Sequence, residues 1–155
     1  NQKKQETASK FFFSPRLGFT LRSSEIYLEI VPLVGYKVFP RFWLGAGPEY
    51  MYFRSGSYHT SIYGASSFAY FAVLDNIQET INIGIGSIFL YLENEILSIQ
   101  PYGQDRAWYD LLLGGAGVRI PVGSRMGISI MALWGLNKST ELLYSNPELR
   151  IMYDF

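Results

Sequence analysis

Apolar and polar residues alternate with a period of two through almost the whole chain. Between Ser14 and Arg22, serine, arginine, glycine and threonine alternate with proline, leucine and phenylalanine. In the next segment one face is apolar, and the other carries Glu29, Gly35 and Lys37. This period is typical of β-strands that have one apolar face and one polar or small face. No segment stands out as helical.

Turn-forming residues divide the chain into strands of roughly the 9–11 residues that a tilted membrane-crossing strand requires. The eight predicted strands span residues 13–22, 25–38, 42–54, 62–74, 77–91, 107–120, 126–136 and 147–155. The short predicted connections are 39–41, 75–76 and 121–125. The long, polar ones are 55–61, 92–106 and 137–146, while Ser23-Ser24 is a tight turn outside this pattern. Alternating short and long connections are typical of outer-membrane barrels, which places both termini in the periplasm.

A membrane barrel differs from a soluble one in which of its two faces, inner or outer, carries the large apolar residues. A soluble barrel would place leucine and phenylalanine inside and lysine and glutamate outside. Here the apolar face is broad and aromatic on every strand, whereas the opposite face is rich in glycine, which suits a narrow interior. These glycines are Gly18, Gly35, Gly45, Gly47, Gly84, Gly86, Gly115, Gly117, Gly127 and Gly135. We therefore predict an all-β fold: an eight-stranded antiparallel up-and-down transmembrane β-barrel over residues 11–155, after a polar periplasmic tail at 1–10.

Composition narrows the range of functions. Only 17% of the residues are charged and 17% are aromatic, whereas about a quarter of an ordinary soluble domain is charged. Basic and acidic residues both number 13, so no basic excess attracts nucleic acid. The chain has no cysteine, no metal-ligand spacing and no apolar run of the roughly 18 residues that a membrane helix needs. We expect a secreted mature chain whose signal peptide has been removed, with no cofactor and no metal.

Charged residues on the inward face predict the contents of the lumen. They are Arg16, Arg22, Glu29, Lys37, Glu49, Arg119, Glu148, Arg150 and Asp154. An eight-stranded barrel is just wide enough to be filled by its own side chains. Five basic groups against four acidic ones favour a plug of paired charges over a ring of one sign. The candidate partners of Arg119 are Glu29, Glu49 and Glu148. The alternative is a narrow channel for ions or small solutes.

The aromatic residues are predicted to form girdles at the two membrane interfaces. The proposed girdle residues are Trp43, Tyr50, Tyr52, Trp108 and Trp134.

The lone histidine raises a catalytic alternative. Outer-membrane lipid A deacylases use a His-x-Ser pair, and His59-Thr60-Ser61 has this spacing. That chemistry also needs a carboxylate to orient the histidine. The next acid is Asp75, which we place across the barrel, and the flanking residues do not match that family. A lipid A-modifying enzyme is therefore only the second alternative, and we predict no catalytic residues.

The last strand ends in a pattern with a known counterpart. Leu149, Ile151, Tyr153 and Phe155 alternate up to a C-terminal aromatic residue. This resembles the signature of outer-membrane barrels that the barrel assembly machinery recognises, although an ordinary amphipathic edge strand could also end in phenylalanine.

The chain as a whole resembles the small outer-membrane β-barrel proteins of Bacteroidota. The similar segments are residues 32–38, 44–50, 114–123 and 146–155. The resemblance implies a location in the outer membrane, contact with its lipids and lipopolysaccharide, and insertion by the barrel assembly machinery. It implies little about function, because a fold does not define one.

We therefore predict a non-enzymatic barrel that acts as a structural or accessory subunit. It would dock on another outer-membrane protein or on a larger complex. Small residues on the lipid-facing wall of the fourth strand, Ala65, Ser67 and Ala69, could accept such a neighbour.

Overall fold

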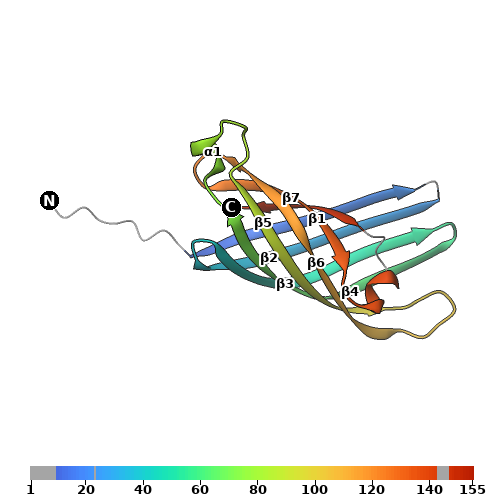
Figure 1. Ribbon diagram of the computed structural model, residues 1–155. Helices are drawn as coiled ribbons and strands as arrows, with labels where there is room; N and C mark the ends of the chain where they lie inside the picture. Colours follow the sequence, from blue (N-terminus) through green and yellow to red (C-terminus); the bar gives the residue numbers. More distant parts are fainter. Residues whose placement is uncertain (1–9, 23, 143–146) are drawn as a thin grey trace.

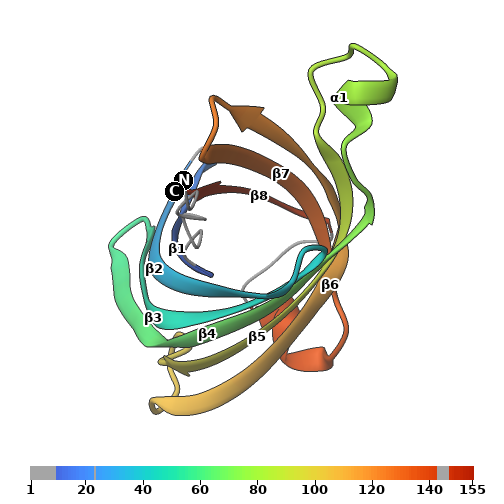
Figure 2. The ribbon, with the colours of Figure 1, turned by 90° about the vertical axis from the view of Figure 1, so that its left-hand side faces the viewer.

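The protein is a closed β-barrel in which every strand is antiparallel to its neighbours (Figure 2). The computed structural model describes residues 10–22, 24–142 and 147–155, without the side chains of 19–22, 78, 80, 141 and 142. The strands are β1 (Phe11–Arg22), β2 (Glu25–Phe39), β3 (Phe42–Ser55), β4 (Tyr58–Leu74), β5 (Ser87–Ile99), β6 (Ala107–Val122), β7 (Met126–Gly135) and β8 (Glu148–Asp154). Their order is up-and-down, and β8 pairs with β1. The predicted fold class is confirmed, while the predicted tail falls mainly on residues 1–9, outside the described ones.

The fifth strand is the one that the sequence placed wrongly. We predicted residues 77–91, but β5 spans Ser87–Ile99. Residues 77–86 alternate like a strand, yet they begin with the short helix α1 (Ile77–Thr80) after Asn76, whose φ is 53°. Gly84 has a φ of 75°, which also ends any extended run. Gly84 and Gly86 therefore lie in a connection and not on the inner face of a strand.

The connections follow the predicted short and long alternation only in part. The link predicted at residues 75–76 is the long segment 75–86, and it lies at the barrel end where β1 begins and β8 ends (Figure 1). Conversely, the predicted loop 55–61 is a tight turn at Gly56, which has a φ of 59°. At the opposite end, residues 100–106 join β5 to β6, and the connection that follows β7 contains the 3-10 helix η1 (Lys138–Leu142).

The outer face is apolar, as predicted. Ile30 and Val34 of β2 are more than half exposed, and every strand carries exposed large hydrophobic residues. The inner face differs from the prediction, because it also holds large apolar residues. Leu33, Phe89 and Leu113 are completely buried inside the barrel. The lumen is thus a packed core that contains charges, instead of a small-residue lumen lined by glycine and ions.

Within the described residues, no helix is both long enough and apolar enough to cross a membrane.

Candidate functional site

The lumen is divided into three layers, which can be followed along the inner face of β5. At the end where β1 begins and β8 ends, β5 contributes aromatic rings from Phe89 and Tyr91. Glu93 and Glu95 follow in the middle, and Leu97 begins an aliphatic layer toward the other end. All five side chains are at most 2% exposed. The aromatic, charged and aliphatic layers therefore follow one another along the lumen.

The aromatic layer is a set of rings in contact across the lumen. Trp43 stacks on Tyr70 at 4.4 Å between centroids, and Tyr70 contacts Phe89 at the same distance. Phe12 meets the edge of Trp43 at 5.1 Å. Such contacts combine large buried area with a preferred geometry. Trp43 is therefore wrong as a girdle residue: the period of two places it on the same face as Glu49, inside the barrel.

Cationic side chains cover the aromatic layer on the side that faces the nearer end of the barrel. Arg119 donates two hydrogen bonds to Asp154, at 3.0 and 2.6 Å, and its guanidinium lies 5.5 Å from the Trp43 centroid. The ammonium of Lys37 lies 4.9 Å from the same ring. These are cation–π distances. Arg119 thus pairs with Asp154, and the three glutamates proposed as its partners were wrong.

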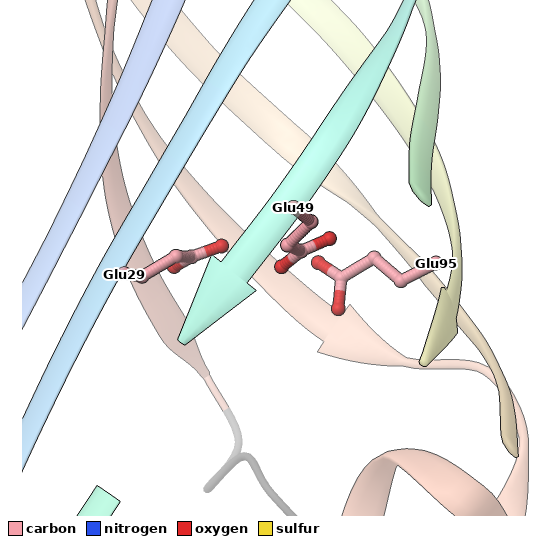
Figure 3. Close-up of side chains that lie close together, drawn as sticks. All are labelled: Glu29, Glu49 and Glu95. Carbon is pink, nitrogen blue, oxygen red and sulfur yellow. The ribbon is translucent and has the colours of Figure 1, made fainter. Parts of the chain in front are cut away.

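The middle layer is a cluster of six charged side chains, which we call the lumenal cluster. Its members are Arg16, Glu29, Glu49, Glu93, Glu95 and Arg150, and each is at most 2% exposed. They come from β1, β2, β3, β5 and β8. Figure 3 shows three of the carboxylates, from β2, β3 and β5, pointing toward one another.

Arg16 lies at the centre of the lumenal cluster. Its Nη2 atom is 2.8 Å from Glu29 and 3.4 Å from both Glu49 and Glu95. Its Nη1 atom forms an ion pair with Glu93.

Arg150 completes the cluster from the adjacent strand. It contacts Glu93 through Nη1 at 2.5 Å and Glu95 through Nη2 at 2.8 Å. Hydroxyl groups add further donors: Ser66 to Glu93 at 2.7 Å and Tyr27 to Glu29 at 3.3 Å.

The remaining predicted lumen residues lie outside the cluster. The structure brings together Arg16, Glu29, Glu49 and Arg150, but it places Lys37, Arg119 and Asp154 at the barrel end. Glu148 is half-buried near the start of β8. Arg22 ends β1, and its side chain lies outside the described part of the structure.

Two members of the cluster were missed by sequence reasoning. Glu93 and Glu95 fall in the segment predicted as a long polar loop, although they belong to β5. Their alternation with Leu92 and Ile96 carries the same period of two as the other strands. Extending that period through the acidic residues would have found them.

The spacing of three carboxylates raises the question of a metal ion. Oxygen atoms of Glu29, Glu49 and Glu95 lie within 4.8 Å of one another. However, Arg16 Nη2 is within 3.4 Å of one oxygen atom of each. The guanidinium group therefore takes the position between the carboxylates that a cation would need. The donor set fits a buried ion cluster better than a metal centre.

The other girdle residues lie on the outer wall. Tyr50, Trp108 and Trp134 are 48%, 64% and 47% exposed, and Tyr52 is partly exposed on the same face of β3 as Tyr50. The Trp108 ring contacts Tyr63 at 6.2 Å. These positions suit the amphipathic rings of a membrane interface.

The predicted catalytic alternative gains no support from geometry. His59 and Ser61 lie near the start of β4, whereas Asp75 follows its other end. The Ser61 hydroxyl forms its hydrogen bond with the Tyr50 hydroxyl at 3.0 Å.

The C-terminal strand presents its alternating residues outward. Leu149, Ile151 and Phe155 are 72%, 43% and 49% exposed, and Tyr153 is partly exposed. Phe155 also closes the barrel, because its backbone N–H donates to the Phe13 carbonyl at 2.9 Å. Recognition of this strand by the assembly machinery stays a prediction.

The architecture is that of an outer-membrane-type barrel: eight antiparallel strands, an apolar outer wall and a filled lumen. Among solved structures, the chain is similar to the N-terminal β-barrel domain of Pseudomonas aeruginosa OprF. The two are 12% identical, with 94% of this chain and 95% of that chain covered and a TM-score of 0.50. This likeness concerns the fold alone. No family model matches the sequence, and no curated protein matches it. The resemblance to the Bacteroidota proteins stays a prediction.

Proposed function

We propose that this protein is a non-enzymatic barrel of the outer membrane that serves as a structural or accessory subunit of a larger outer-membrane assembly. The observation that carries the proposal is the filled lumen, which leaves the outer wall and the connecting loops as the surfaces for function. Both termini would face the periplasm, and the wall would contact membrane lipid and, on the outer leaflet, lipopolysaccharide.

The filled lumen argues against the channel alternative. Aromatic, charged and aliphatic layers follow one another along β5 with every inward side chain from Phe89 to Leu97 at most 2% exposed. A solute would have to separate the ion pairs of Arg16 and Arg150 from their glutamates. We therefore expect the purified barrel to give no steady current in planar lipid bilayers. A stable, ion-selective current that changes in an Arg16→Met variant would instead support a channel.

One part of the outer wall differs from the rest. On β3, β4 and β5, Ala46, Ser67 and Asn94 stand side by side in the strand register. Leu17 and Ile151, elsewhere on the wall, are bulky and 53% and 43% exposed, although β6 and β7 also carry the small outward residues Ala116 and Ala132. Small residues permit close approach of a second protein surface in a membrane. We call Ala46, Pro48, Ala65, Ser67, Ala69 and Asn94 the small-residue patch.

A polar group within this patch strengthens the proposal. The Asn94 amide donates to the Asp110 carboxylate and, at 3.3 Å, to the Leu111 carbonyl. Asp110 is exposed on the outer wall. Polar groups that face lipid are unfavourable and are usually found where protein or water meets them. A neighbouring outer-membrane protein that packs closely on the small residues and offers polar groups to Asn94 and Asp110 would fit both features.

Site-specific crosslinking in native membranes tests the accessory role. A photo-crosslinking side chain at position 67 should capture another outer-membrane protein, since Ser67 lies within the small-residue patch. The same probe at position 17 is the matched control, because Leu17 is equally outward-facing but lies on β1. Capture of the same species from both positions, or from neither, would contradict a specific docking wall.

Mass spectrometry of lipid A tests the enzymatic alternative. Lipid A that is altered when the protein is expressed would favour that alternative.

A further inference from the structure

The lumenal cluster contains more acidic than basic groups. Four glutamates face two arginines, and all six side chains are at most 2% exposed. With every group ionised the cluster would carry −4 + 2 = −2. Arg119 and Lys37 are held at the barrel end beyond the aromatic layer, and half-buried Glu148 adds more negative charge. An uncompensated charge is strongly unfavourable in an interior of low dielectric constant.

The supply of hydrogen-bond donors is unequal among the four glutamates. Arg16 Nη2 carries two protons but has three carboxylates around it. Glu29 is the closest at 2.8 Å, while Glu49 and Glu95 are both at 3.4 Å. Glu95 has a shorter contact of 2.8 Å with Arg150.

Glu49 is left with the poorest set of donors. Its Oε1 atom accepts from Arg16 at 3.4 Å, and its Oε2 atom is buried without a hydrogen-bond partner among the described residues. Glu29 and Glu93, by contrast, also accept from the Tyr27 and Ser66 hydroxyls. Glu49 is therefore the glutamate for which a negative charge is least stabilised.

Two of the groups beside Glu49 are themselves carboxyl groups, which offer acceptors. Oxygen atoms of Glu29, Glu49 and Glu95 lie within 4.8 Å of one another, and their carboxyl groups converge (Figure 3). Two carboxylates at such a distance repel each other unless one of them holds a proton. A protonated carboxyl group gains an O–H donor, which a neighbouring carboxylate can accept.

We propose that Glu49 is a neutral carboxylic acid in the folded barrel, and that its proton, shared with the Glu29 or Glu95 carboxylate, makes the stability of the lumenal cluster depend on pH. This proton lowers the excess charge of the cluster from −2 to −1. The inference does not rest on the accessory role, because it concerns only the closed lumen.

Among the described side chains, the groups around Glu49 include no further positive charge. The described titratable and charged groups that face the lumen around the cluster are Arg16, Tyr27, Glu29, Tyr91, Glu93, Glu95, Glu148 and Arg150. On β4 the polar group is Ser66. Strands β6 and β7 contribute apolar side chains to the core, including Leu113 and Leu133.

The proton gives a definite sign to the pH dependence. In the unfolded chain Glu49 would ionise near the ordinary glutamate value of about 4.3. Above that pH, until the folded barrel also releases the proton, the folded state binds one proton more than the unfolded state. The unfolding equilibrium constant should therefore rise about tenfold per pH unit through this one group, so stability falls as pH rises.

Infrared spectroscopy combined with urea unfolding tests this protonation state. The purified full chain in lipid vesicles should show the carbonyl stretch of a buried carboxylic acid at neutral pH. In Glu49→Gln the band should disappear while the barrel remains at least as stable, because an amide replaces a neutral acid of the same shape. The rise of the unfolding constant from mildly acidic to mildly alkaline pH should shrink by about tenfold per pH unit.

Glu29→Gln is the matched control. It removes a carboxylate that accepts from both Arg16 and Tyr27, so it should lose stability, whereas Glu49→Gln should not. The proposal is overturned if the wild-type protein lacks the band, or if the band survives in Glu49→Gln. It is equally overturned if Glu49→Gln fails to fold while Glu29→Gln folds. Stability that depends on added calcium or magnesium and falls with a chelator would assign the missing charge to a cation.

Discussion

Replacing Arg16 with methionine should destabilise the barrel more than any other single change of a charged residue that we describe. Arg16 is completely buried and contacts all four glutamates of the lumenal cluster. Removing one partner of a buried ion pair costs on the order of 3–5 kcal/mol, because the other charge stays buried without compensation. We expect a loss of at least this size, measured by urea unfolding and by the mobility of the unheated barrel on a detergent gel.

Arg119→Met is the matched control for this prediction. Arg119 has a single carboxylate partner in Asp154, and its side chain is 18% exposed, so water can compensate part of the loss. The loss of stability in Arg119→Met should therefore be clearly smaller than that in Arg16→Met. Adding Glu29→Gln to Arg16→Met should recover part of the stability, since the double change removes one stranded carboxylate. Equal losses for the two arginine variants would mean that the lumenal cluster has no special energetic role.

The sequence was sufficient to predict the class of fold, because each strand carries its own period of two. Strands β1 to β4 and β6 to β8 lie within a few residues of their predicted bounds. The fifth was displaced because Ile77, Ile81 and Ile83 repeat an apolar spacing inside a connection. No local pattern distinguishes such a connection from a strand, since the difference lies in the pairing of Ser87–Ile99 with β4 and β6.

The candidate site was predictable in its residue types but not in its pairing. The period of two along each strand placed Arg16, Glu29, Glu49 and Arg150 inside the barrel. The same rule would have moved Trp43 from the girdle to the lumen. Three of the four partners of Arg16, namely Glu29, Glu49 and Glu95, lie 13, 33 and 79 residues away along the chain. Those contacts depend on the register and stagger of the closed barrel, which one sequence does not reveal. The excess of acid over base therefore became visible only in the structure.

The close approach of two neighbouring strands explains why a glycine stands at position 115, one of the predicted inward glycines. Its replacement should cause the second large loss of stability that we predict. A Cβ atom added at Gly115 of β6 would lie 1.9 Å from the backbone carbonyl oxygen of Ala132 on β7. A backbone atom in a paired strand cannot rotate away as a side chain can. Gly115→Ala should therefore separate or shift β6 and β7 and cost about 1–3 kcal/mol or more, the range for overpacked sites.

The adjacent glycine provides the control within the same strand. At Gly114, on the outer face, the nearest atom to an added Cβ is a flexible leucine methyl, Leu136 Cδ1, at 3.1 Å. Both substitutions change a strand glycine to alanine, so the intrinsic backbone contribution is the same. Gly114→Ala should fold with near wild-type stability, whereas Gly115→Ala should unfold at lower urea concentration and show a smaller fast-migrating fraction on an unheated gel. Similar behaviour of the two variants would show that the β6–β7 contact tolerates a methyl group, and the inward glycine would then have no steric requirement.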